Sequence, residues 1–311
     1  MSAPYPTSSG ELPFDAPGAG KPCKTWYTTI GDLSSTPQKP VLIGIHGGPG
    51  SGHDYLLGLA DVYAQRGVPV LLYDQIGCGH STHLREKAGD ASFWTVDLFL
   101  QELENLVAHL GLHDRGFHLL GQSWGGMLVC EYASRRPKGL RRVVMSGAPA
   151  SMPLYKQACQ LRLAEMPGDV AASLAECDRK GDHESEAFKK AAAVFMKNFV
   201  CRLEDIPEPL QRTFGNVKED STAYNTMQGH AEFETIGTLK DWEGWRYAHQ
   251  IEVPTLLLNG KYDEVMDFVM EPFFRVINKV RWVTLPNSSH VSMWEDRERY
   301  MQLVGDFLEG A

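Results

Sequence analysis

Residues 121–126 read Gly121-Gln122-Ser123-Trp124-Gly125-Gly126, between an apolar run at 117–120 and a helix-forming run at 127–133. This pattern predicts a strand, a sharp turn and a helix, in which a glycine on each side of the serine lets the backbone turn tightly. Such a turn lifts the serine hydroxyl above the sheet, so Ser123 is a candidate nucleophile that attacks a carbonyl carbon. The same pentapeptide pattern also arises by chance in glycine-containing loops, and the interpretation therefore depends on finding the partners that the serine needs.

A glycine-rich loop offers the amide donors that a reacting carbonyl requires. Residues 46–50 read His46-Gly47-Gly48-Pro49-Gly50 and follow the apolar run 41–45. This arrangement matches the oxyanion loop that lipases and esterases place after an early strand. We expect the amides of Gly48 and Trp124 to bind the oxyanion, with Gly47 as a further donor and substrate contact. A phosphate-binding loop is the alternative, but the Gly-Lys-Ser/Thr ending of such loops is missing.

The acid that would orient a catalytic histidine is expected at the end of a late strand. An apolar run at 253–258 predicts a buried strand, and the turn at its carboxyl end finishes at Asp263. Open α/β sheets keep their sites at the carboxyl ends of strands, which makes Asp263 the chosen acid. Glu264 and Asp267 are rivals by position, and a loop aspartate is often only a solvated turn residue.

The candidate base follows the next predicted strand, at 281–285, in a loop that ends at His290. The resulting chain order of serine, acid and histidine is the order used by serine hydrolases built on an α/β sheet. Most of the other histidines fit this role less well because they precede Ser123 or flank a helix end.

Predicted strands and helices alternate along most of the chain, which indicates a mostly parallel central sheet flanked by helices. The expected strands lie at 25–30, 41–45, 69–73, 117–120, 142–146, 253–258 and 281–285, and the expected core helices at 54–66, 94–110, 127–133 and 294–308. Between 150 and 242 the strand patterns stop and helical patterns appear, at 154–164 and 186–199. We therefore expect a core formed by 1–149 and 243–311, with 150–242 inserted as a helical cap.

Composition and charge exclude several other classes of protein. A net charge of −9 argues against a nucleic-acid partner, and no apolar stretch is long enough to predict a membrane span. Residues 1–6 lack the features of a secretory signal, so a cytoplasmic protein is expected. The six cysteines show neither zinc-ligand nor disulfide spacing, and Cys78 lies in a turn without a nucleophile's surroundings. We predict neither a metal nor another cofactor.

Several motifs in a common order give the chain a family resemblance. They are the glycine-rich loop 46–50, the serine turn 121–126, Tyr262-Asp263-Glu264-Val265, the segment 289–296 around His290, and the stretches 74–79 and 227–233. Together they resemble the proline iminopeptidases, most closely the tricorn-interacting aminopeptidase branch, from about residue 25 onward. The resemblance implies an α/β-hydrolase fold and a serine aminopeptidase that acts on small molecules or short peptides with a free amino terminus.

The resemblance also implies that Glu232 and Glu264 bind the substrate ammonium, which needs charge-assisted hydrogen bonds in a partly dry pocket. His230, Ala231 and His80 differ from the residues expected in relatives, which leaves the preferred amino-terminal residue open. Two other hypotheses remain. An esterase, lactonase or amidase would use the same three catalytic residues, and a non-catalytic binding protein could retain the fold.

Overall fold

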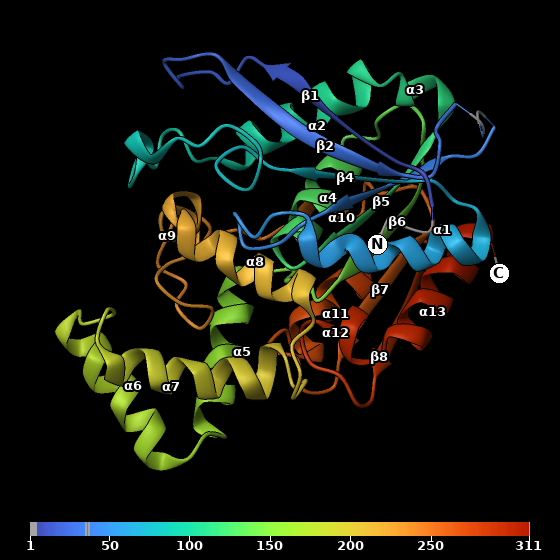
Figure 1. Ribbon diagram of the computed structural model, residues 1–311. Coiled ribbons are helices and arrows are strands. Elements are labelled where there is room, and N and C mark those ends of the chain that lie inside the picture. The colour runs from blue at the N-terminus through green and yellow to red at the C-terminus, as the bar shows by residue number, and fades with distance from the viewer. Residues whose placement is uncertain (1–4, 35, 37, 311) are drawn as a thin grey trace.

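The computed structural model describes residues 5–34, 36 and 38–310, and its centre is a single sheet of eight strands (Figure 1). The strands are β1 (Thr7–Phe14), β2 (Cys23–Ile30), β3 (Val41–Ile45), β4 (Val70–Asp74), β5 (Phe117–Gln122), β6 (Leu140–Ser146), β7 (Thr255–Gly260) and β8 (Val280–Leu285). Their order in the sheet is β1-β2-β4-β3-β5-β6-β7-β8. Only the pairings of β1 with β2 and of β2 with β4 are antiparallel. The predicted mostly parallel sheet is confirmed.

Helices cover both faces of the sheet. The helical elements of the core are η1 (Asp54–Leu59), α1 (Ala60–Arg66), η2 (Arg85–Lys87), α2 (Val96–His109), α3 (Leu112–Arg115), α4 (Trp124–Ser134), α10 (Trp245–Ala248), α11 (Asp267–Val276), α12 (Ser292–Glu295) and α13 (Arg297–Glu309). Helices α1 and α13 pack side by side on one face, and α2, α4 and α11 pack on the other. The single helix expected at 54–66 is a 3₁₀ segment followed by an α-helix.

Strand β3 shows how the sheet is held between these two helical layers. All of its residues are buried, and successive side chains point to opposite faces. Ile43 joins the apolar cluster beneath α2 and α4, whereas Leu42 joins the cluster beneath α1 and α13. A parallel strand covered on both sides is expected to read as a continuous apolar run, which is the pattern that predicted 41–45.

The chain between β6 and β7 contains no strand in the part that the structure describes. Its helical elements before residue 243 are α5 (Met152–Ala164), α6 (Gly168–Lys180), α7 (Glu186–Phe195), the π-helical turn η3 (Met196–Val200), α8 (Glu208–Glu219) and α9 (Thr222–Met227). We refer to residues 150–242 as the cap. In Figure 1 the pair formed by α6 and α7 projects away from the sheet, whereas α8 lies beside η1.

Helix α8 is attached to the core by polar contacts. The Thr213 hydroxyl accepts a hydrogen bond from the Tyr55 amide at 3.1 Å. The Asn216 side chain donates to the Ser51 carbonyl and to Asp54, each at 3.1 Å. These contacts fix α8 against the segment that directly follows the glycine-rich loop. Among the described residues no helix has both the length and the apolar character needed to cross a membrane.

Candidate active site

Ser123 occupies the tight turn between β5 and α4 and has a backbone φ of +56° and ψ of −125°. Positive φ is rare for a residue other than glycine and costs about 1–3 kcal/mol, which is typical of functional sites. The flanking glycines leave space for this turn. A Cβ on Gly121 would collide with the Gly125 carbonyl oxygen, and one on Gly125 would collide with the Ile45 carbonyl oxygen. The strain therefore falls on the serine, and the glycines are required for close packing.

The structure brings Asp263 and His290 together from loops that follow the adjacent strands β7 and β8. One carboxylate oxygen of Asp263 lies 2.8 Å from the Nδ1 atom of His290 and also accepts the Val265 amide at 2.7 Å. Both side chains are buried. The rival Asp267 accepts a hydrogen bond from Asn259 instead. Of the acids considered from the sequence, Asp263 is the one that contacts Nδ1, as the orienting acid of a catalytic histidine must.

The remaining nitrogen of His290 is directed toward the other rival acid. Its Nε2 atom lies 3.8 Å from a carboxylate oxygen of Glu264. Burial lowers the pKa of His290, but the carboxylates of Asp263, Glu264 and Glu232 outweigh it and raise the pKa to about 10. Three acids thus surround one imidazole and favour its protonated form.

Glu264 is fully buried, and its partner is a cap residue that the sequence analysis did not single out. The Tyr155 hydroxyl, on α5, lies 3.2 Å from one carboxylate oxygen of Glu264 and 2.9 Å from the Glu232 carbonyl oxygen. The other oxygen of Glu264 has no hydrogen-bond partner among the described residues. Burial raises the pKa of Glu264 well above its usual range; the nearby His290 lowers it, and the Glu232 and Asp263 carboxylates raise it further.

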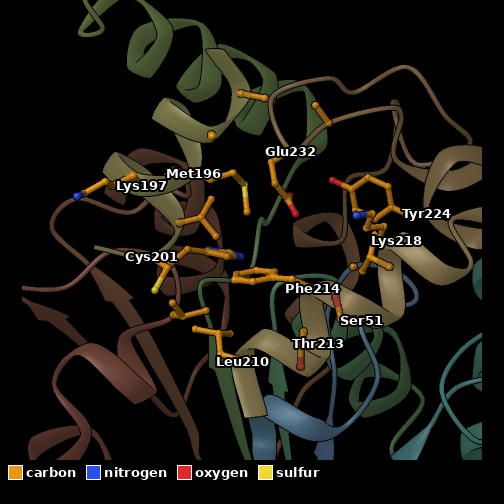
Figure 2. A pocket seen from close by; sticks show the side chains of 18 of the residues that line it. Ser51, Met196, Lys197, Cys201, Leu210, Thr213, Phe214, Lys218, Tyr224 and Glu232 are labelled. Carbon is orange, nitrogen blue, oxygen red and sulfur yellow. The ribbon is translucent and has the colours of Figure 1, made fainter. Parts of the chain in front are cut away.

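Glu232 reaches the same place from the loop that follows α9. Figure 2 shows its carboxylate pointing into the pocket, on the side of Tyr224. Burial raises the pKa of Glu232, while His290 and the Tyr224 hydroxyl oppose that change. A buried acid with an elevated pKa releases its proton readily when a cation arrives to pair with it. The two glutamates therefore form a site suited to a positively charged group.

Amide donors border the hydroxyl of Ser123. Gly48 has a φ of +107°, and with Ser123 and Trp124 it lines a small cavity. Trp124 is the first residue of α4, so its amide has no partner within the helix. The amide of Gly47, in contrast, donates to the Tyr55 hydroxyl at 2.8 Å. Gly47 is thus engaged within the fold, and we do not retain it as an oxyanion donor or substrate contact.

Two cavities meet at Ser123. The larger has a volume of about 890 Å³, and the smaller about 10 Å³. Ser123, Gly48 and Glu232 border both cavities. His290 borders only the larger one, whereas Tyr155 borders only the smaller one. The open space beside Ser123 therefore lies almost entirely in the larger cavity.

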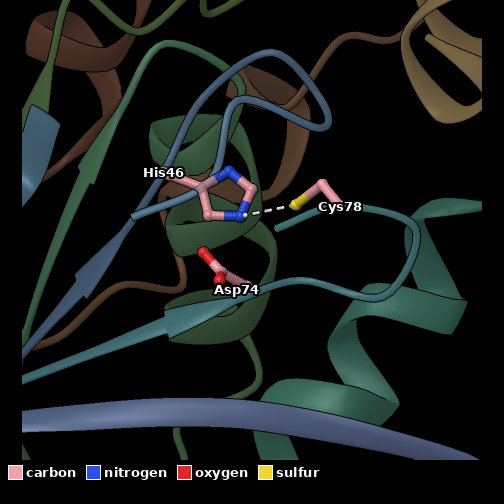
Figure 3. A group of neighbouring side chains, drawn as sticks. All are labelled: His46, Asp74 and Cys78. Atoms are coloured by element: carbon pink, nitrogen blue, oxygen red, sulfur yellow. Dashed lines mark hydrogen bonds between the residues drawn. The ribbon is translucent and has the colours of Figure 1, made fainter. Parts of the chain in front are cut away.

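Two groups of potential metal ligands come together that the sequence spacing did not reveal. One comprises His46, Asp74 and Cys78 (Figure 3), and the other His53, Asp74 and His80. Their polar atoms are used in hydrogen bonds. Nδ1 of His46 lies 2.9 Å from the Gly47 carbonyl and its Nε2 accepts the Gln75 amide, so His46 fixes the glycine-rich loop. The Asp74 carboxylate accepts from the ring nitrogens of His53 and His80, one on each oxygen.

Comparisons with known proteins agree with this geometry. Residues 40–297 match the family model described as the alpha/beta hydrolase fold, which is the class that the sheet, the strained serine turn and the late acid and histidine define. The chain is 36% identical to a proline iminopeptidase of Saccharolobus solfataricus over 86% of this chain and 84% of that protein. It is 35% identical to a proline iminopeptidase of Heyndrickxia coagulans over 86% and 90%. The protein belongs to the proline iminopeptidase family.

Solved structures give the same relationship. The crystal structure of the proline iminopeptidase from Mycobacterium smegmatis matches with a TM-score of 0.85 and 33% identity, over 97% of this chain and 98% of that one. The crystal structure of VinJ matches with a TM-score of 0.91 and 41% identity, again over 97% and 98%. The similarity therefore includes the cap as well as the sheet.

Proposed function

We propose that the protein is a serine aminopeptidase that releases an amino-terminal proline, or another small apolar residue, from peptides or amino-acid amides. The observation that carries this proposal is the pair formed by Glu232 and Glu264 beside His290. Glu264 lies 3.8 Å from the Nε2 atom of His290, and Glu232 lines both cavities that Ser123 borders. An ammonium group would give the unpartnered oxygen of Glu264 a donor and would neutralise part of the negative charge. The names of the relatives support the same activity.

The reaction requires His290 to accept a proton from Ser123. The three carboxylates that raise the pKa of His290 oppose this step in the free protein. A substrate ammonium between Glu232 and Glu264 offsets their charge, lowers the pKa of His290 and so favours the neutral imidazole. Substrate binding would thereby prepare the base for the chemistry.

The covalent steps use the same positions. The oxygen of Ser123 attacks the carbonyl carbon of the first residue while its proton passes to His290. Amides of Gly48 and Trp124 stabilise the oxyanion, and Asp263 holds the imidazolium in place. His290 then protonates the leaving amine. Water attacks the acyl-enzyme, gives its proton to His290 and releases the free amino acid, and the proton returns to Ser123.

We propose a direction for the substrate from the residues that line the two cavities. His290 must reach the leaving amine, and it borders only the larger cavity, which is therefore the leaving-group side. Tyr155, the partner of Glu264, borders only the smaller cavity, so the ammonium group of the first residue would point toward that side. Apolar side chains of Met127, Met152 and Leu239 line this smaller cavity, which suits an apolar rather than a charged side chain on the first residue.

The cap and the cellular location complete the proposal. We propose that residues 150–242 act as a lid, since they supply Glu232 and Tyr155 and cover Ser123. All six cysteines are free and buried, which suits a reducing compartment, and we propose that the protein is cytoplasmic. An esterase or lactonase is less favoured, because a substrate without an amine would leave Glu264 without a partner.

The test compares prolyl and alanyl arylamides with a free amine against the same amides after N-acetylation. Acetylation removes the charge and leaves the carboxylates poorly paired, so we expect kcat/KM to fall by about 100-fold or more. Equal kcat/KM for the two forms would overturn the proposed amine site. Phenyl acetate is the control: turnover of this ester above that of every free-amine amide would support the esterase hypothesis instead.

A further inference from the structure

The larger cavity is apolar over most of its wall. Its lining includes Met196 and Val200 from η3, Leu203 and Ile206 from the following segment, and Leu210 and Phe214 from α8. Figure 2 shows Phe214 in the middle of the pocket side chains, between Cys201 and Ser51. Phe214 is 37% exposed, although an aromatic ring of this size is usually buried in a soluble protein. Binding of an apolar group against this wall is therefore favourable, because it removes apolar surface from water.

The volume is large for the leaving group of a short peptide. A cavity of about 890 Å³ is near the upper end of the range that binds drug-sized ligands, roughly 300–1,000 Å³. The smaller cavity on the other side of Ser123 has only about 10 Å³. The open space beside Ser123 thus lies almost entirely on the side that His290 borders, from which it would protonate the leaving amine.

The polar groups of the larger cavity are poorly suited to a peptide backbone. Every residue of a peptide brings an amide donor and a carbonyl acceptor that must find partners when buried. The Thr213 hydroxyl is already engaged, since it donates to the Pro209 carbonyl and accepts the Tyr55 amide. Lys197 pairs with Glu204 at 3.2 Å, and Lys189 pairs with Glu184 at 3.4 Å. Lys218, His230 and the Ser51 hydroxyl also line the cavity, a small number of polar groups for the backbone of a bound peptide.

We infer that the leaving-group side of this site accepts an amine with an extended hydrocarbon body, so that the preferred substrates are apolar amides of a small amino acid rather than polar peptides. This inference rests on the proposed aminopeptidase function and specifies its substrate class. The reaction is the same: the amide bond breaks, and the amine leaves with a proton from His290. The hydrocarbon body adds binding free energy by covering the wall formed by η3 and α8.

The experiment measures kcat/KM for prolyl amides of butylamine, hexylamine and octylamine, and for the peptide Pro-Gly-Gly, below the aggregation concentration of each substrate. Burial of a methylene group contributes about 0.8 kcal/mol, so we expect kcat/KM to rise about two- to fourfold per added methylene until the cavity is filled. The octylamide should exceed Pro-Gly-Gly by more than tenfold. A flat series, or a preference for Pro-Gly-Gly, would overturn the inference.

Two matched variants test whether this wall is responsible. Phe214→Lys introduces a charge into the apolar wall and should bring the ratio of octylamide to butylamide kcat/KM close to one. Phe274→Lys alters another exposed phenylalanine, 46% exposed, on α11 and outside both cavities, and should leave the ratio unchanged. An equal fall of the octylamide-to-butylamide ratio in both variants would contradict the inference.

The results also separate this inference from the proposed function. If the chain hydrolyses none of the free-amine amides, the aminopeptidase proposal fails and the inference fails with it. If kcat/KM for the butylamide and for Pro-Gly-Gly equals or exceeds that for the octylamide, the aminopeptidase proposal stands and only the inference about the leaving group is wrong.

Discussion

The carboxyl edge of the sheet and the cap contribute to the site in different ways. Ser123, Asp263 and His290 lie in loops that follow β5, β7 and β8, and the pairings of β6 with β7 and of β7 with β8 are parallel and regular. Glu232 and Phe214 come from the cap, where helices are partly exposed and the contacts with the core are fewer. In the proposed function, the carboxyl ends of the strands supply the reacting groups, and the cap supplies groups that select the substrate.

The largest effect is expected at the sheet edge. Ser123→Ala removes the attacking oxygen, and we expect kcat/KM for prolyl arylamides to fall by roughly 10⁴- to 10⁶-fold, as for other serine nucleophiles. Substrate affinity, measured by calorimetry, should change little because the cap is intact. The control is Ser92→Ala, an exposed serine before α2, which should retain full activity. Substantial turnover by Ser123→Ala would show that another residue is the nucleophile.

A change in the cap should act on binding. Glu232→Gln removes one charge from the ammonium site, and the loss of a charged hydrogen bond is worth about 1.5–3 kcal/mol. We therefore expect kcat/KM for free-amine substrates to fall by about 10- to 100-fold, mainly through KM. For N-acetylated substrates, which are expected to be poor, kcat/KM should change by less than threefold. Glu219→Gln, at the exposed end of α8, is the matched control; a similar loss there would argue against a specific role for Glu232.

The pH dependence connects the two regions. Glu264 helps to raise the pKa of His290, so Glu264→Gln should lower that pKa and extend the acid limb of the kcat/KM profile to lower pH. The direction follows because a neutral amide no longer stabilises the imidazolium. The pH profiles of kcat/KM for the unmodified protein and for Glu264→Gln are measured with the same substrate. Ionisation of the substrate then affects both profiles equally. Asp267→Asn should leave the limb in place, and a shift of the limb to higher pH in Glu264→Gln would contradict the assigned electrostatics.

The smallest effect concerns the attachment of the cap. Arg162, on α5, donates to the carbonyl oxygens of Asp263 and Lys261 at 2.9 Å. Arg162→Met leaves these carbonyls without a donor, and we expect it to lower the free energy of unfolding by about 1–3 kcal/mol. Denaturant titration measures this change. Lys138→Ala removes only an exposed pair with Asp114 and should cost less than about 1 kcal/mol; equal losses would show that Arg162 does not anchor the cap.

The sequence predicted the centre of the fold better than its periphery. Strand β3 was predicted at its observed limits because a continuous apolar run marks a strand buried on both faces. Strand β1 was not predicted, since it is an edge strand with mostly exposed residues and contains Gly10 and Pro13. Helix α11 was not predicted because Pro272 lies inside it, and packing of Val269 and Phe273 against the core outweighs the cost of the proline.

The cap was the least predictable region. Helix α8 was not among the predicted helices, although it begins at Glu208 and holds Pro209 in its first turn, where a missing amide has no cost. Tyr155 was within a predicted helix, yet its contact with Glu264 joins residues that are 109 positions apart in the chain. Such a contact depends on how the helices pack on the sheet, which local patterns do not contain.

The attachment of α8 to the segment after the glycine-rich loop has a consequence for redesigning the enzyme. Thr213 and Asn216 bind this helix to Tyr55 and Ser51, so a foreign α8 would disturb the segment next to Gly48, one of the two proposed oxyanion donors. The pair formed by α6 and α7 projects outward and makes no such contact among the described residues. Replacement of cap helices by those of relatives should therefore be limited to α6 and α7, and the native α8 should be kept.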